Sequence, residues 1–175
     1  MKARGIILLV ILLSGSLILL FGIIRQETPE IKNIESLKAP EFVLKDLNGN
    51  IYNSSDLRGS VLFINFWASW CEPCLEEMPS IENLYDHFKN DNHFRMFAVL
   101  YRDDYQKAIG YMKENDFHFP VFLDNGENAA RSFGITGVPE TYIIDKKGIL
   151  RGKVIGPEEW NSPEAITFIS NLLKE

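Results

Sequence analysis

The chemistry that this sequence offers is concentrated in Cys71 and Cys74, which are the only cysteines among its 175 residues. An apolar run, residues 61–66, precedes them, and apolar residues recur every three or four positions after them, as on one face of a helix. The pair is therefore expected where a buried strand turns into an amphipathic helix. Unpaired N–H groups and the helix dipole lower the pKa of a thiol in a first helical turn, and the thiolate is the nucleophile. We expect Cys71 to attack a disulfide, and Cys74, one turn deeper, to close a new one.

A permanent structural disulfide is the alternative interpretation of this pair. A Cys-x-x-Cys bridge closes so short a loop that it constrains little chain and would stabilise little. The strand-to-helix context favours a redox pair instead. Two cysteines are too few for a four-cysteine zinc site, and the three histidines, His87, His93 and His118, share no ligand spacing.

Two separate motifs in the same order make the chain similar to a known family. Residues 65–74 read Asn-Phe-Trp-Ala-Ser-Trp-Cys-Glu-Pro-Cys, Pro79 follows, and residues 134–145 read Gly-Ile-Thr-Gly-Val-Pro-Glu-Thr-Tyr-Ile-Ile-Asp. From Ala39 to its C-terminus the chain resembles the thioredoxin-fold proteins, and more closely the membrane-anchored thiol–disulfide oxidoreductases of the TlpA/ResA/CcmG type. The resemblance implies a thioredoxin-like fold with a central mixed sheet flanked by helices, and a redox-active disulfide in place of any cofactor or metal.

Turn signals and periodicity independently predict an α/β chain with helices on both faces of a sheet. Asn48-Gly49, between two short apolar runs, indicates an N-terminal β-hairpin extension. Strands are expected at residues 41–44, 51–52, 61–66, 94–101, 121–123, 141–144 and 150–155. Helices are expected at residues 71–89, 105–115, 129–133 and 163–173.

Glu72 and Pro73 lie between the two cysteines. The resemblance implies that they tune the redox behaviour of the pair, and a Glu-Pro pair is typical of ResA-like members, which are reductants in an oxidising compartment. Physically, the charge of Glu72 beside Cys71 should raise the pKa of that thiol against the helix dipole. Alternatively, Glu72 only caps or solvates the first helical turn.

Asn65 departs from the pattern of cytoplasmic thioredoxins, where a buried aspartate moves the proton of the inner cysteine. An asparagine cannot act as a general base. In ResA-like proteins a glutamate one turn beyond the second cysteine is the proposed substitute, and Glu77 falls at that position. The alternative is that Glu77 is an ordinary solvated helix residue.

Val138-Pro139 resembles the cis-proline loop of the same fold. That loop would face the cysteines, and the backbone of Val138 would pair with an extended substrate segment. An ordinary trans turn is the alternative. Glu140 matches the residue type of CcmG-like members, in which acidic groups near the site are implicated in partner choice. Trp70, directly before Cys71, is expected to cover the site, so these four residues form the expected substrate-binding set.

The first residues predict a membrane segment. Two basic residues precede residues 5–24, which carry no charge and have the length of about 20 residues that a helical span requires. A cleaved signal peptide is the alternative, but its apolar region is usually about 7–15 residues long and ends at a small-x-small site, which is missing here. We expect residues 1–25 to hold a cytoplasmic start and a single-pass anchor, residues 26–38 a linker, and residues 39–175 the thioredoxin-like domain.

The flanking basic residues place the N-terminus in the cytoplasm and the domain on the extracytoplasmic, periplasmic side of a bacterial membrane. Residues 1–25 contribute three of the 18 basic side chains and none of the 24 acidic ones, so the remainder has a formal charge of −9. Without a Lys/Arg-rich tract, nothing indicates nucleic-acid binding.

Two functions are consistent with these residues. The first is a thiol–disulfide oxidoreductase, acting as a reductant of protein disulfides. For it the resemblance implies a membrane thiol-transfer donor of the CcdA/DsbD kind, and as substrate the Cys-x-x-Cys-His of apocytochrome c, as in cytochrome c-type biogenesis. The second is a copper-delivery module on the same fold, although such modules carry Cys-x-x-x-Cys and a downstream histidine.

Overall fold

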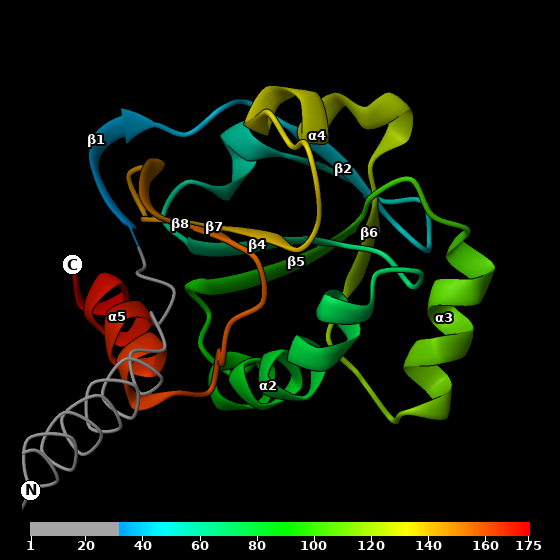
Figure 1. Cartoon of the computed structure of the whole chain (residues 1–175). Helices are drawn as coiled ribbons and strands as arrows, with labels where there is room; N and C mark the ends of the chain where they lie inside the picture. The colour runs from blue at the N-terminus through cyan, green and yellow to red at the C-terminus, as the bar shows by residue number, and fades with distance from the viewer. Residues whose placement is uncertain (1–31) are drawn as a thin grey trace, which may run out of the picture. The chain divides into compact units, whose positions relative to one another are not determined.

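The computed structural model describes residues 32–175, which form one mixed β-sheet with helices on both of its faces (Figure 1). The expected membrane segment, residues 1–25, and the first part of the expected linker lie outside the described residues. Within residues 32–175, no helix is both long enough and apolar enough to span a membrane.

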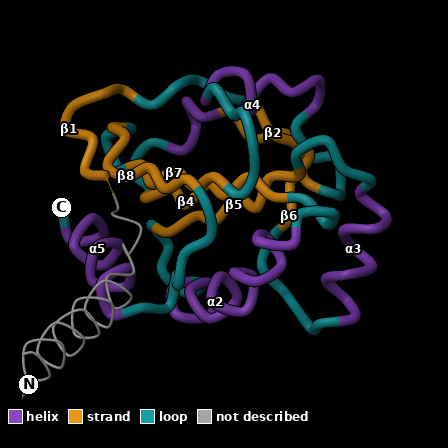
Figure 2. Tube along the Cα trace, in the orientation of Figure 1, coloured by secondary structure: helices purple, strands orange, loops and turns teal. Residues whose placement is uncertain are grey.

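The sheet has the spatial order β1-β8-β7-β4-β5-β6-β2-β3. β4, β5 and β6 run parallel to one another, and the other neighbouring pairs are antiparallel. The strands are β1 (Lys32–Lys38), β2 (Val43–Asp46), β3 (Ile51–Asn53), β4 (Val61–Trp67), β5 (Phe94–Leu100), β6 (Val121–Leu123), β7 (Glu140–Ile144) and β8 (Ile149–Ile155). In Figure 2 they form the central layer between the helices.

β4 is the strand that leads to the cysteines, and all seven of its residues are buried. It pairs with β5 on one side and with β7 on the other, so none of its edge is exposed. Successive side chains of a strand point to opposite faces, and a strand covered on both faces is apolar at nearly every position. Phe63 and Trp67 accordingly pack into one core, whereas Ile64 and Phe66 pack into the other.

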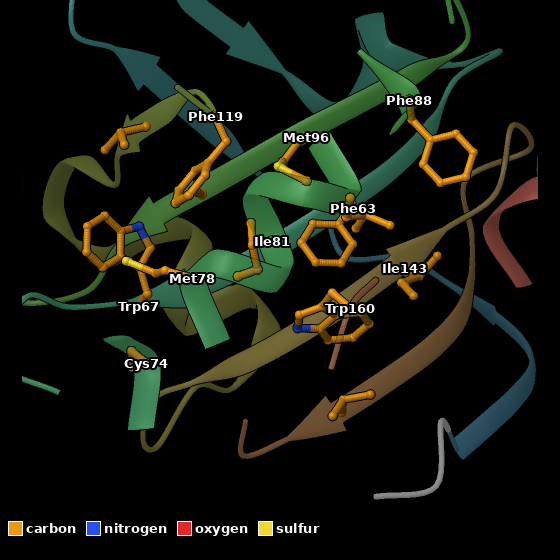
Figure 3. Packing of buried hydrophobic residues seen from close by; sticks show 14 of the residues in the cluster. Phe63, Trp67, Cys74, Met78, Ile81, Phe88, Met96, Phe119, Ile143 and Trp160 are labelled. Carbon is orange, nitrogen blue, oxygen red and sulfur yellow. The ribbon is translucent and has the colours of Figure 1, made fainter. Parts of the chain in front are cut away.

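Helices cover the two faces unequally. The larger core lies beneath α2 (Glu72–Phe88), α3 (Tyr105–Glu114) and α5 (Pro163–Lys174), and the smaller core lies beneath α4 (Asn128–Phe133). In the larger core the rings of Phe63 and Trp160 meet edge to face, with their centroids 4.8 Å apart. Figure 3 shows this pair together with Met78 and Ile81 of α2 and with Cys74 in the same core.

The predicted mixed sheet, the helices on both faces and the N-terminal hairpin are confirmed. The hairpin is β2–β3, and it joins the main sheet because β2 also pairs with β6. β1 differs from the sequence prediction, which assigns these residues to the linker. It pairs with β8 as an edge strand, and two lysines and a glutamate among its seven residues suit an edge, which natural proteins protect with charge. Because its composition is polar, the pattern of apolar runs does not predict this strand.

Candidate active site

Cys71 and Cys74 form a disulfide at the junction between β4 and α2. Cys71 is the N-cap of α2, and its sulfur accepts a hydrogen bond from the N–H of Cys74 at 3.3 Å. Glu72 and Pro73 follow in the first turn with exposed side chains. Cys71 retains 4% of its accessible surface and Cys74 none, so Cys71 is the sulfur that a second protein can reach.

This geometry favours a thiolate at Cys71 once the disulfide is reduced. An N–H group that points at the sulfur, at the positive end of a helix dipole, stabilises a negative charge there. Pro73 fits in the first turn because its missing N–H would have no helical partner. The side chain of Glu72 is exposed, and its effect on the pKa of the Cys71 thiol stays a prediction.

The Val138–Pro139 bond is cis, which confirms the predicted loop type. The carbonyl oxygen of Val138 lies 3.4 Å from the sulfur of Cys71. A disulfide sulfur carries no hydrogen, so this is a contact in the oxidised protein and becomes a possible hydrogen bond only when Cys71 is a thiol. The N–H of Gly156 donates to the carbonyl of Pro139 and ties this loop to the end of β8.

Trp70 lies beside Cys71 and keeps 61% of its surface exposed. Its indole N–H donates to the carbonyl of Arg102 at 3.2 Å, in the loop after β5. Asp103 of the same loop accepts hydrogen bonds from the N–H and the hydroxyl of Ser69. These hydrogen bonds fix the turn before Cys71 to the loop that follows β5. The ring of Trp70 offers an apolar surface next to the Cys71 sulfur.

Glu77 lies one turn beyond Cys74, as predicted, and it is 3% exposed rather than solvated. One carboxylate oxygen accepts a hydrogen bond from the side-chain amide of Asn65 at 2.8 Å. The other accepts from the indole of Trp160 and from the backbone N–H of Glu158, both at 3.1 Å. The sequence alternative of an ordinary solvated residue is thus wrong for this position.

Burial is the main reason that the pKa of Glu77 rises from 4.5 to about 7. The three hydrogen bonds stabilise the ionised form and oppose this rise, whereas the charge of Glu158 adds to it. A carboxyl group with a pKa near 7 exchanges its proton readily at neutral pH, which is the property that a general acid or base requires.

Asn65 takes part in this network without titrating. Its amide nitrogen donates to Glu77 and to the hydroxyl of Thr141 in β7, each at 2.8 Å, while its oxygen has no hydrogen-bond partner within the described chain. Asn65 thus fixes the position of Glu77 relative to the sheet, and of these two groups only the carboxyl group can take up or release a proton.

Glu140 differs from its expected role as a substrate contact. It is 4% exposed, and its carboxylate accepts a hydrogen bond from Tyr142 at 2.7 Å and pairs with the ammonium group of Lys153 at 2.5 Å. Side chains alternate along β7, so Glu140 points with Tyr142 into the face opposite that of Thr141. Both partners contact the same carboxylate oxygen, and the side chain is buried, so it is not presented at the surface beside Cys71.

Trp160, Glu158 and Ser80 belong to the site and were not predicted from the sequence. Trp160 and Glu158 approach Glu77 from more than 80 residues away along the chain, and Ser80 links them to α2. No spacing rule connects them to the cysteines. In the sequence, only Trp160, the tryptophan that follows the last expected strand, indicates this part of the site.

Across residues 32–175, no group of three or more His, Cys, Asp or Glu side chains is arranged to hold a metal ion. The prediction that the protein uses no metal remains a prediction.

The buried Glu77 makes the stability of the oxidised protein depend on pH. A carboxyl group whose pKa is raised on folding adds stability that is fully present below its unfolded pKa of 4.5 and is lost as the pH rises through about 7. We expect this group to lower the free energy of unfolding by roughly 2–4 kcal/mol over that interval. Urea titrations at several pH values should show this loss in the wild type and in Glu76→Gln, an exposed neighbour, but not in Glu77→Gln. Equal pH dependence in all three would contradict the assignment.

Comparisons with known proteins agree with this geometry. The family model described as AhpC/TSA family matches residues 36–153. The thiol–disulfide oxidoreductase ResA of Bacillus subtilis is 37% identical over 114 residues, which cover 65% of this chain and 63% of that protein. ResA of Bacillus thuringiensis is 33% identical over 132 residues, 75% of each chain.

Two solved structures extend the agreement to the fold. A thiol:disulfide interchange protein DsbE from Chlorobium tepidum superposes with a TM-score of 0.64 and 26% identity, over 82% of this chain and 97% of that one. StoA from Bacillus subtilis superposes with a TM-score of 0.57 and 25% identity, over 68% and 90%. The chain belongs to the AhpC/TSA family of thioredoxin-fold proteins and, within it, to the thiol–disulfide oxidoreductases of the ResA type.

Proposed function

We propose that this protein is an extracytoplasmic reductant of protein disulfides in cytochrome c-type biogenesis. The observation that carries the redox part is the position of Cys71, which caps α2 beside the Cys74 N–H and the Val138 carbonyl. The similarity to ResA and DsbE supports thiol–disulfide exchange as the reaction, and the proposed direction of electron flow and substrate class follow from the family resemblance of the sequence motifs.

The reaction begins with the pair reduced. The Cys71 thiolate attacks one sulfur of the substrate disulfide, a mixed disulfide forms, and the other substrate sulfur leaves as a thiolate that takes up a proton. Cys74 then loses its proton and attacks the sulfur of Cys71, and the second substrate sulfur leaves. Two electrons pass to the substrate, and the protein is left with the Cys71–Cys74 disulfide, the state that the structure describes.

Glu77 is the proposed acceptor of the Cys74 proton. Cys74 is fully buried, so water has little access to its thiol, and Asn65 cannot act as a base. The pKa of Glu77, raised by burial to about 7, leaves a substantial fraction ionised at neutral pH and able to take a proton. Its charge also raises the pKa of a neighbouring thiol by like-charge repulsion.

The substrate segment is proposed to lie extended along the cis-proline loop. The half-buried Val138 supplies backbone groups for pairing, and Pro139, without an N–H, keeps a competing donor away from the sulfur pair. Trp70 gives the segment an apolar contact, and Glu72 adjusts the charge around Cys71. The proposed electron donor is a membrane thiol-transfer protein of the CcdA/DsbD kind.

The order of attack can be tested by removing each sulfur in turn. With a peptide that carries an oxidised Cys-x-x-Cys-His motif, Cys71→Ser should lose disulfide reduction down to the uncatalysed rate, because the nucleophile is gone. Cys74→Ser should accumulate a mixed disulfide, since Cys71 can still attack and nothing resolves the product. Mass spectrometry under non-reducing conditions detects this adduct, and the variant lacking both cysteines is the control that should form none. Normal turnover by Cys74→Ser would show that the two roles are misassigned.

The proposed location can be tested by fractionation. If residues 1–25 anchor the chain with its domain outside, full-length protein at its unprocessed mass should sediment with membranes, and external protease should digest the domain in spheroplasts. A cytoplasmic protein of the same cells, which should survive the protease, controls for lysis. Recovery of a shortened soluble form would show instead that the segment is a cleaved signal peptide.

A further inference from the structure

The loop between β8 and α5 is attached to α2 at Glu77. The N–H of Glu158 donates to the Glu77 carboxylate at 3.1 Å. The hydroxyl of Ser80 on α2 lies 2.7 Å from the Glu77 carbonyl and 3.2 Å from the Glu158 carbonyl, to either of which it can donate, and it accepts the N–H of Trp160 at 3.0 Å. These bonds, together with the Trp160 indole, hold the loop beside the buried carboxyl group.

The side chain of Glu158 brings a second carboxylate to this place. One of its oxygens accepts the N–H of Glu159 at 2.9 Å. The other is buried and has no hydrogen-bond partner among the residues that the structure describes. Burying a charged oxygen without a partner costs free energy, so the position of this side chain calls for an explanation.

The other groups that contact the Glu77 carboxylate are neutral. Asn65 reaches it from β4 and Trp160 from the loop, and Thr141 of β7 joins through Asn65. On α2, Ser80 contacts only the backbone of Glu77. None of these contacts is cationic, so no positive charge in direct contact offsets the repulsion between the two carboxylates.

We propose that Glu158 is a positioning residue that adds to the effect of burial on the proton affinity of Glu77 and so helps Glu77 to accept the proton of Cys74. Negative charge on Glu158 disfavours negative charge on Glu77, and the backbone N–H of the same residue keeps the Glu77 carboxylate in place. This inference rests on the proposed role of Glu77 as proton acceptor.

The next residue of the loop, Glu159, provides a matched control for Glu158. Glu159 follows directly and carries the same charge, but its side chain is exposed and hydrogen-bonds to no part of Glu77. Water screens a charge of this kind, so its removal should change the Glu77 carboxyl group little. If any negative charge in this loop raised the pKa of Glu77, removing the charge of Glu159 would have the same effect as removing that of Glu158. The proposed coupling predicts a lower Glu77 pKa only when the charge of Glu158 is removed.

The test is a carboxyl titration of the oxidised full-length chain, in which no thiol titrates. Carbon-13 NMR of glutamate-labelled protein follows the Glu77 signal, which is assigned by its loss in Glu77→Gln. Its midpoint should lie near 7 in the wild type and in Glu159→Gln. Glu158→Gln should lower it by at least about half a pH unit, and Glu158→Asp, which retains the charge, by less.

A midpoint unchanged in Glu158→Gln, or lowered equally in Glu159→Gln, would overturn the proposal. The reaction gives a second readout: the pH at which reduction of the disulfide peptide is half-maximal should move in Glu158→Gln in the same direction as the carboxyl midpoint. A wild type that reduces no disulfide at any pH would refute the proposed function instead, and the carboxyl midpoints distinguish these two failures.

Discussion

Burial of the Glu77 carboxyl group between β4, α2 and the loop before α5 is the constraint on which the rest of the site depends. Its oxygens bind Asn65 on the sheet and two N–H donors on the loop, so one side chain joins three segments that are distant in sequence. The same burial raises its pKa to about 7. A group that holds the site together is therefore also the group that can move a proton within it.

The architecture explains why the two cysteines differ. β4 is covered on both faces and paired on both edges, so its end is fixed, and α2 begins immediately after it. Cys71 lies at the rim of that junction beside Trp70 and the Val138 carbonyl, whereas Cys74 lies one turn inside the larger core. One sulfur is thus available to a partner protein and the other only to its neighbour, which is the asymmetry that stepwise disulfide exchange requires.

Local patterns predicted much of the molecule. The apolar run of β4, the Asn48-Gly49 turn and the helical period after Cys74 each follow from nearest-neighbour physical chemistry, and each corresponds to an element of the structure. The resemblance placed Glu77 and the Val138–Pro139 loop at the site, which spacing alone could not do.

The remaining features depend on contacts between distant segments. Trp160 and Glu158 reach Glu77 only because the loop after β8 packs on α2, and no local pattern encodes that contact. Glu140 has the residue type of a surface contact, but the alternation of β7 turns it towards Lys153. β1 is polar and becomes a strand because β8 offers it an edge. Sequence patterns thus predict the elements and the chemical groups, whereas tertiary packing decides which groups face one another.

The central claim is that Cys71 and Cys74 form a reversible redox pair that donates electrons. The most direct test is an equilibrium redox titration of the full-length chain in dithiol/disulfide buffers, with the free thiols counted by mass after alkylation. We expect a single two-electron transition with a midpoint at or below about −270 mV, the value of the reductant thioredoxin. A midpoint near about −120 mV, typical of the strong oxidant DsbA, would contradict this claim, as would a pair that stays oxidised at every potential.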